Sequence, residues 1–312
     1  MSVVLVKVNS IQLILMAFIG VPIQIVNEWI GTRLLCASGA GESMYVHTFG
    51  AYFGLTVVFV LHHSNSIDCP DEKSRYTPDI YSMIGTKFLF CFWPSFNAGD
   101  ETGTNRLYAV TNTYVSICAS VVGAFLMSSL LKRGKFDMIH IQNFTLVGGV
   151  AVGTVSGSNI GLHGAMMIGT LAGMISVVGF HFLLPKLKQY RIHDTCDVNN
   201  LHSIPGLTAG VVGIIVASIG NRSGYLNSLT DVCRDGGKSR NNSTQSAYQA
   251  AALGLTFGMA VVGGLITGFM LRLPISAQKE RDFDDEEGWH LPEENIKDNN
   301  NMFGANIART AL

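Results

Sequence analysis

Residues 107–131 of this chain read LYAVTNTYVSICASVVGAFLMSSLL, a run of 25 residues without a charged side chain. A helix rises 1.5 Å per residue, so about 20 residues cross the ~30 Å of hydrocarbon in a lipid bilayer. Runs of similar length recur along the 312-residue chain, and its 21 basic and 22 acidic residues gather in short stretches between them. The sequence therefore predicts an all-α, polytopic membrane helix bundle.

Apolar runs bounded by charged residues predict eight membrane-spanning helices. They are expected at 10–35, 44–63, 79–98, 107–131, 136–157, 160–185, 199–220 and 247–271. The segments between them are short and polar, so consecutive helices should be antiparallel neighbours in one bundle. We expect residues 1–275 to form this transmembrane domain and residues 276–312 to form a polar, irregular tail.

The distribution of Lys and Arg between alternate loops predicts the orientation of the bundle. The set of loops that includes Lys132 and Arg272 carries more basic residues than the other set, which places it in the cytoplasm together with the C-terminal tail. The loop at 222–247 then lies outside. There Asn241 and Asn242 begin overlapping Asn-X-Ser/Thr acceptors for glycosylation, although a chance match of this motif is an equally good explanation.

Composition and motif spacing exclude several classes of function. A net charge of −1 provides no basic face for nucleic acid. The six cysteines show no CxxC pair or metal-ligand spacing, and we interpret them as packing residues. No nucleophile with its base and no phosphate-binding loop is found in the spans, so we predict neither an enzyme nor a resident cofactor or metal. No removable signal peptide is predicted.

Ionisable side chains inside apolar spans are costly to bury and are therefore the first candidates for function. Three stand out, namely His47, His202 and Lys87. A structural hydrogen bond explains each histidine equally well, because a neutral imidazole both donates and accepts. Lys87 is expected to extend toward the cytoplasmic end of its span, with an inward-facing position as the alternative.

The surroundings of the two histidines form a faint repeat. Asp194 precedes His202 by eight residues, Gly39 precedes His47 by the same distance, and a glycine follows each histidine within four residues. Because the second and seventh spans run in opposite directions, this repeat would be inverted, and inverted repeats in transporters place a binding site near the membrane midplane. Chance agreement and axial ligation of a haem are the alternatives, although no second histidine pair supports the haem.

Five segments of the chain resemble the Rh glycoproteins of the ammonium transporter/Rh superfamily. They read HTFGAYFGLT, WPSFN, DMIHIQN, GGVAVG and NNLHSIPG, at residues 47–56, 93–97, 137–143, 148–153 and 199–206. The resemblance extends from about Ile11 to Asn295. It implies a multi-pass protein of the plasma membrane, assembled as a homotrimer, in which each subunit has its own pore for ammonia or ammonium. It adds carbon dioxide as a further candidate substrate.

The resemblance also implies roles for individual residues. His47 and His202 correspond to the paired pore histidines, one from each half of the inverted repeat. Phe96 corresponds to one of two stacked phenylalanines at the outer mouth, and its neighbour Asn97 is included in the predicted pore site. Asp194 corresponds to the acidic residue that precedes the second histidine.

Two departures from the family pattern affect these expectations. Members of the family carry about four more helices at the N-terminus, so this sequence is expected to supply about eight of twelve spans. A non-conducting membrane scaffold or an inactive fragment is therefore the alternative function. The family also has an aspartate where Gly39 stands here, and the nearby Glu42 is the candidate to replace it.

Overall fold

A computed structural model of the chain describes residues 1–5, 7–62, 72, 74–220 and 240–273. Every regular element in these residues is a helix. In chain order they are η1 (Ser2–Val4), α1 (Ser10–Trp29), η2 (Ile30–Leu34), η3 (Ser43–Thr48), α2 (Phe49–Val60), α3 (Tyr76–Asn97), α4 (Gly103–Leu131), α5 (Met138–Phe144), α6 (Val147–Val152), η6 (Gly153–Val155), α7 (Gly161–Phe182), α8 (Leu184–Gln189), η7 (Asn199–Ser203), α9 (Ile204–Ile219) and α11 (Asn242–Leu271).

Each of the eight predicted spans corresponds to helix in the structure, and the all-α fold class is confirmed. Seven helical stretches of the described chain are long and apolar enough to cross a membrane. The exception is α3, a helix of 22 residues whose apolar pattern is interrupted by polar side chains such as Asp79 and Lys87. The fifth predicted span is broken after Phe144, where α5 ends and α6 begins three residues later.

The last span begins five residues before the predicted start at residue 247, because Asn241 caps it. The Asn241 side chain accepts a hydrogen bond from the backbone N–H of Thr244 at 2.7 Å. Asparagine is among the preferred residues at a helix N-cap. The Asn-X-Ser/Thr motifs therefore lie at the first turn of α11, not in the middle of a loop. The predicted tail at 276–312 falls outside the described residues.

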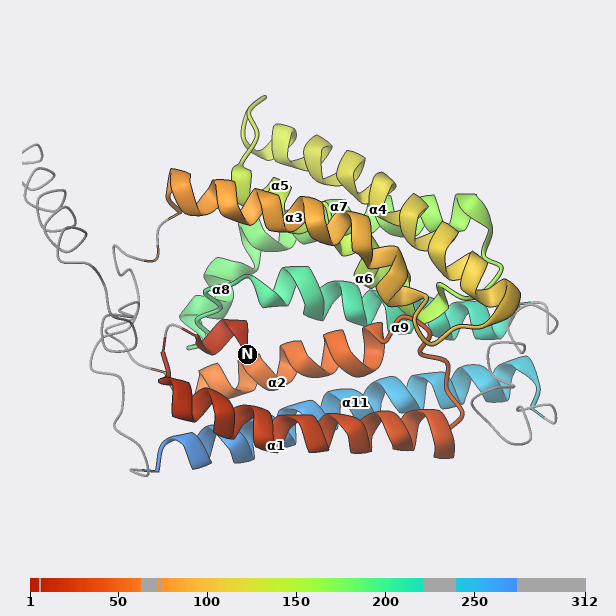
Figure 1. Ribbon diagram of the computed structural model, residues 1–312, viewed down its shortest axis with the longest axis horizontal. Helices are drawn as coiled ribbons and strands as arrows, with labels where there is room; N and C mark the ends of the chain where they lie inside the picture. Colours follow the sequence, from red (N-terminus) through yellow and green to blue (C-terminus); the bar gives the residue numbers. More distant parts are fainter. Residues whose placement is uncertain (6, 63–71, 73, 221–239, 274–312) are drawn as a thin grey trace, which may run out of the picture.

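The long helices run side by side along the longest axis of the molecule (Figure 1). On one side α1 and α11 lie together, and α11 also packs against α2 and α9. On the other side α4 packs against α3, α6 and α7. The α9 helix contacts both α11 and α6, so it joins the two groups of helices.

The helices bury small and polar side chains and expose large apolar ones. On α4 the buried residues include Asn112, Ser116 and Ser120, whereas Val122 and Leu130 are 65% and 64% exposed. Small side chains let helix backbones approach closely and are typical of contacts between membrane helices. A soluble bundle would have the opposite arrangement, so this distribution indicates that lipid surrounds the molecule.

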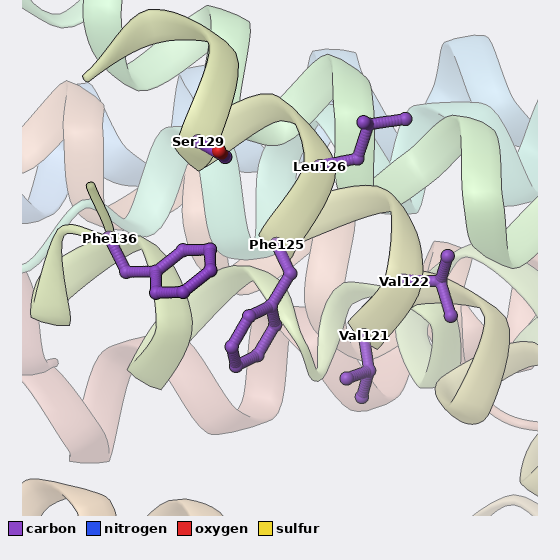
Figure 2. A pocket seen from close by; sticks show the side chains of 6 residues that line it. All are labelled: Val121, Val122, Phe125, Leu126, Ser129 and Phe136. Carbon is purple, nitrogen blue, oxygen red and sulfur yellow. The ribbon is translucent and has the colours of Figure 1, made fainter. Parts of the chain in front are cut away.

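The outer face of α4 carries a shallow hollow of about 480 Å³ (Figure 2). Its lining is almost entirely apolar and comprises Val121, Val122, Phe125, Leu126, Ser129 and Phe136. Such a surface suits contact with hydrocarbon. The polar residues that could handle a small hydrophilic molecule lie elsewhere, between the helices.

One cysteine differs from its interpretation as a packing residue. Cys36, at the end of α1 and η2, is disulfide-bonded. Cys91, Cys118 and Cys196 are free thiols. The bonding partner of Cys36 lies outside the described residues.

Candidate functional site

The structure brings His47 and His202 together, although 155 residues separate them in the sequence. Their Nδ1 atoms are 3.2 Å apart, and the two rings are parallel within 4° with centroids 5.1 Å apart. Each neutral ring carries one proton, so a hydrogen bond between the two Nδ1 atoms requires that one donates and the other accepts. The two rings therefore act as one polar unit inside the bundle.

Both histidines lie in short π-helical turns that lead directly into α-helices. His47 is in η3, which continues as α2, and His202 is in η7, which continues as α9. Single π-helical turns are rare and are often found at functional sites. The two turns give the predicted inverted repeat a common local conformation that the sequence pattern did not reveal.

The close approach of the two turns depends on Gly206, which lies one turn after His202. A Cβ atom at this position would collide with the Thr48 hydroxyl and would lie 3.0 Å from the carbonyl oxygen of Ser43. Glycine therefore allows α9 to lie directly against η3. Without this approach the two imidazoles could not reach each other.

Two aromatic residues of α3 surround His47. The indole of Trp93 stacks on the His47 ring with centroids 5.7 Å apart and planes 16° apart, and Phe96 meets it edge-on at 5.8 Å. Trp93 is 8% exposed and Phe96 is 48% exposed. Sequence reasoning singled out Phe96 and missed Trp93. Their separation of three residues, which puts both on one helix face, was the available signal.

His47 retains one ring nitrogen that has no hydrogen-bond partner. Its Nε2 atom is buried and unpaired among the described residues. A buried polar atom without a partner costs about 1–3 kcal/mol. A small molecule that forms hydrogen bonds would relieve this cost, so the histidine pair can receive such a guest beside Trp93 and Phe96.

Asp194 acts on this site through the backbone. It is 4% exposed, and its carboxylate accepts hydrogen bonds from the backbone N–H groups of Val198 at 2.9 Å and Asn199 at 2.7 Å. Burial raises the pKa of this carboxyl, and the two backbone bonds oppose that rise. Asp194 therefore fixes the start of the helix that carries His202 and does not itself contact the ring pair through these bonds.

Asn97 holds helices together. Its side chain is fully buried, and Nδ2 donates to the Thr113 hydroxyl at 2.9 Å and to the Gly149 carbonyl at 3.0 Å. These bonds join α3 to α4 and α6. They fix the end of α3 that presents Phe96.

The departure from the family pattern at Gly39 has a steric explanation. A Cβ atom on Gly39 would lie 2.5 Å from the ring of Tyr45, which is buried and occupies this space. An aspartate at this position would therefore collide with Tyr45. Glu42 does not supply the missing cap, because its side chain forms no capping hydrogen bond at the start of η3. The turn with His47 is thus packed around an aromatic ring, whereas the turn with His202 is capped by a carboxylate.

Glu42 instead belongs to an acidic region near this end of the bundle. Burial, together with the carboxylates of Glu28 and Asp100, raises the pKa of Glu42 to about 7. Its backbone is in the left-handed region, with φ of 54°.

Lys87 is exposed on α3 and does not face inward. The first residue of that helix, Tyr76, is 11 positions away, which corresponds to about 16 Å of helix rise. This distance corresponds to about three turns of helix.

Comparison with known proteins identifies the family. Residues 1–290 match the model of the Ammonium Transporter Family. The chain belongs to this family. It is 43% identical to ammonium transporter Rh type A of Bos taurus over 302 residues, and 43% identical to ammonium transporter Rh type C of Homo sapiens over 303 residues. The alignments cover 95% and 94% of this chain, and 66% and 63% of those proteins. The chain thus spans slightly less than two thirds of the length of these curated relatives.

The fold matches that of solved structures. The structure of Nitrosomonas europaea Rh50, described as a member of the Rhesus family of channels, matches with a TM-score of 0.76 and 30% identity. The match covers 100% of this chain and 77% of that one. Saccharomyces cerevisiae Mep2 matches with a TM-score of 0.59 at 16% identity, which shows the fold alone. Family membership and seven helices able to cross a bilayer make this chain a multi-pass membrane protein of a transporter family.

Proposed function

We propose that this chain forms the greater part of an Rh-type channel for ammonia and ammonium, with His47 and His202 as the polar pair within its pore. The observation that carries the proposal is the parallel pair of buried imidazoles, joined Nδ1 to Nδ1 at 3.2 Å and contributed by two different helices. The relatives that are named ammonium transporters support the choice of substrate. Because these relatives are longer than this chain, the activity of the whole protein is proposed here for the chain and is not inferred directly from them.

The chemistry of the pair favours the neutral form of the substrate. A bare ammonium ion would lose most of its hydration between apolar helices, at a cost of several kcal/mol or more. Ammonia loses far less, and it both donates and accepts hydrogen bonds. The unpaired Nε2 of His47 and the bonded ring pair therefore suit ammonia, and the dehydrated cation is disfavoured.

The aromatic residues beside the pair suit the charged form before it loses its proton. Phe96 is half exposed, and its ring lies against His47. An aromatic face attracts a cation through its quadrupole by about 0.5–2 kcal/mol. We propose that Phe96 receives ammonium at the mouth and that Trp93 holds the plane of the His47 ring.

Several further properties belong to this proposal. We place the protein in the plasma membrane as a homotrimer, with residues 1–275 in the bilayer and the tail at 276–312 in the cytoplasm. Carbon dioxide is proposed as a second substrate because it is neutral and small. The scaffold alternative has no observation in its favour.

A flux measurement tests the proposed function. Proteoliposomes containing the chain are exposed to an ammonium gradient, and the internal pH is followed by stopped-flow fluorescence. An N-terminally extended form of the chain is measured in parallel, because the relatives are longer. The proposal requires faster alkalinisation than in empty liposomes for at least one of the two forms. An inert extended form that still assembles in the membrane would favour the scaffold.

The two overlapping glycosylation motifs provide a test of orientation, and we expect Asn241 to be the modified residue. Asn241 is exposed, and only its carbonyl oxygen is used in capping, so its Nδ2 remains available. The Nδ2 of Asn242 instead donates to the carbonyls of Ser218 and Gly220, at 3.3 and 3.1 Å. Each motif can be removed without changing either asparagine. Ser243→Ala disables the motif at Asn241, and Thr244→Ala disables the motif at Asn242.

After expression in a eukaryotic host, Ser243→Ala should abolish the mobility shift caused by removal of N-glycans. Thr244→Ala should preserve it. A shift that persists in Ser243→Ala and disappears in Thr244→Ala would reverse the assignment. No shift in the unmodified chain would argue against the outward orientation of this end.

A further inference from the structure

A buried lysine lies beneath the helix that carries His202. Lys7, in the segment between η1 and α1, is 6% exposed, and its Nζ atom donates to the backbone carbonyl of His193 at 3.1 Å. Both groups are buried. Removing an ammonium group from water is unfavourable unless other groups compensate for it. The position of Lys7 therefore requires a compensating interaction, and the segment it touches provides one.

The carbonyl that Lys7 binds belongs to the peptide group directly before Asp194. The positive charge of Lys7 lowers the pKa of Asp194 and thereby opposes the effect of burial. The Asp194 carboxylate in turn binds the N–H groups of Val198 and Asn199, which begin the helix of His202. A continuous set of buried polar contacts thus leads from Lys7 to the start of that helix.

The turn that Lys7 supports is conformationally strained. Arg191 and Asp197, on either side of Asp194, have φ values of 67° and 54°. The left-handed conformation is unfavourable for most residues other than glycine, although asparagine and aspartate adopt it more readily. The turn therefore depends on contacts from outside the segment.

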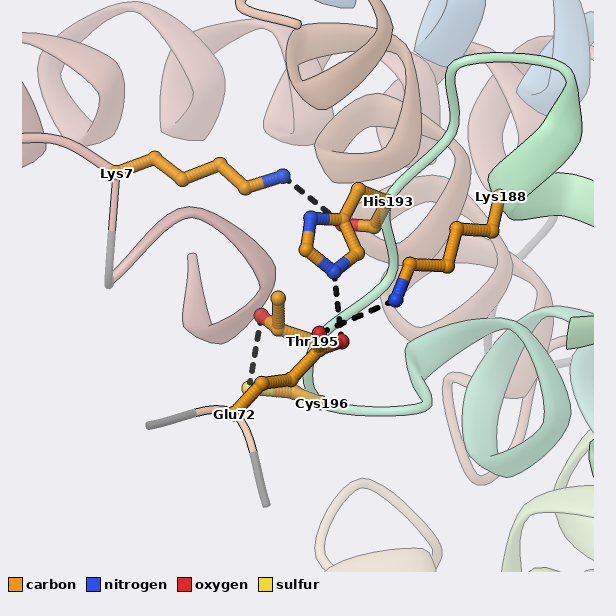
Figure 3. A network of polar contacts seen from close by, with 6 residues as sticks. All are labelled: Lys7, Glu72, Lys188, His193, Thr195 and Cys196. Carbon is orange, nitrogen blue, oxygen red and sulfur yellow. Dashed lines mark hydrogen bonds and ion pairs between the residues drawn. The ribbon is translucent and has the colours of Figure 1, made fainter. Parts of the chain in front are cut away.

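A second contact holds the same turn from another direction (Figure 3). Glu72 binds the His193 ring through its Oε1 atom at 2.6 Å from Nε2, and its Oε2 atom pairs with the Lys188 ammonium at 3.2 Å. Segments far apart in the sequence therefore converge on residues 193–197. Among the described residues, the charged or titratable groups around the Asp194 carboxylate and its turn are the chain's amino terminus, Lys7, Glu72, Lys188, His193, Cys196 and Asp197.

We propose that Lys7 is a positioning residue for the histidine pair, because its buried ammonium holds the 193–197 turn and the Asp194 cap from which the His202 helix begins. This inference rests on the proposed function for its transport readout. Its structural part concerns the backbone of the turn and can be measured without transport.

Loss of the ammonium group should make the site sensitive to acid. Without Lys7, the pKa of Asp194 rises further, so its carboxylate takes up a proton at a higher pH as the solution is acidified. Each unit of this rise increases the protonated fraction about tenfold at a given pH above the pKa. The protonated form offers a weaker cap to the N–H groups of Val198 and Asn199, so the start of the helix loosens on the acidic side.

The variants Lys7→Gln and Lys7→Arg separate charge from hydrogen bonding. Glutamine retains a donor for the His193 carbonyl but removes the charge, whereas arginine retains both. Lys132→Gln is the control for loss of a lysine charge elsewhere, because Lys132 forms an ion pair with Asp137 at 2.7 Å on the turn between α4 and α5. Size-exclusion chromatography confirms that each variant is folded before measurement.

Hydrogen exchange of the Val198 and Asn199 amides is the first readout. Lys7→Gln should accelerate this exchange about tenfold at pH 6 and by a smaller factor at pH 8. In Lys7→Arg and Lys132→Gln the exchange rates should match those of the unmodified chain. The second readout is ammonia flux relative to the unmodified chain at each pH. In Lys7→Gln it should fall more at pH 6 than at pH 8, because the protonated fraction of Asp194 is larger at the lower pH. A variant that only weakened the fold would lose flux equally at both values.

Unchanged amide exchange in Lys7→Gln overturns the proposal, as does faster exchange with the flux profile of the unmodified chain. If neither the unmodified chain nor its extended form conducts ammonia, the proposed function fails and a different readout decides the inference. In that case ¹⁵N spectra of labelled histidine report the Nδ1–Nδ1 hydrogen bond directly. Loss of its signal in Lys7→Gln at pH 6 supports the positioning role, and an unaltered signal refutes it.

Discussion

Replacing His202 with leucine is expected to lower ammonia flux about tenfold, and replacing His47 should have a comparable effect. Leucine preserves approximate volume but leaves the remaining imidazole with an unpaired Nδ1 atom, because the present partner is the ring 3.2 Å away. A buried nitrogen without a partner costs about 1–3 kcal/mol, and about 1.4 kcal/mol corresponds to a tenfold change. Stopped-flow measurement of internal pH in proteoliposomes checks the expected loss.

The double variant His47→Leu/His202→Leu tests whether the two rings act as a unit. Residues in direct contact do not contribute additively, so the double change should cost less than the sum of the two single changes. His163→Leu is the control, because His163 is exposed at the start of α7. If the loss in the double variant equalled the sum of the losses in the two single variants, the role of the pair would be contradicted. An equal loss of flux in His163→Leu would contradict it as well.

Substitution of Gly206 with alanine should separate the two histidine turns. The added methyl group would collide with the Thr48 hydroxyl and would lie 3.0 Å from the Ser43 carbonyl, and this backbone group cannot rotate away. Forcing extra volume into a packed interior typically costs about 1–3 kcal/mol. We expect lower thermal stability in detergent and a flux at least as low as that of the single histidine variants.

Gly258→Ala provides a control with the same chemical change at a helix position that has open space around it. A Cβ atom at Gly258, on α11, would meet no atom within 4 Å. Alanine favours helix over glycine by about 1 kcal/mol, so this variant should be neutral or slightly more stable. If Gly206→Ala behaved like Gly258→Ala, close contact between α9 and η3 would not be what holds the pair together.

The fold could be predicted from the sequence because hydrocarbon imposes a strong constraint on length and polarity. Runs such as 107–131 have few alternatives to a membrane helix, and the structure has a helix at Gly103–Leu131. Boundaries were less predictable where a side chain caps a helix. The Asn241 cap starts α11 before its apolar residues begin, and α3 forms although polar residues interrupt it.

The candidate site could be predicted only in part. The cost of burying an imidazole singled out His47 and His202 individually. Their direct contact depends on two helices meeting across 155 residues, which no local pattern encodes. The stacking of Trp93 on His47 and the exclusion of an aspartate by Tyr45 are likewise consequences of packing between distant segments.

The two halves of the site are held in place by different physical forces. The turn before His202 is fixed by a carboxylate that binds two backbone N–H groups, whereas the turn before His47 is filled by the ring of Tyr45. The carboxylate binds the backbone N–H groups more weakly once it is protonated, whereas the shape of an aromatic ring does not change with pH. A falling pH should therefore loosen the turn before His202 and leave the turn before His47 rigid, so that acid distorts the site asymmetrically.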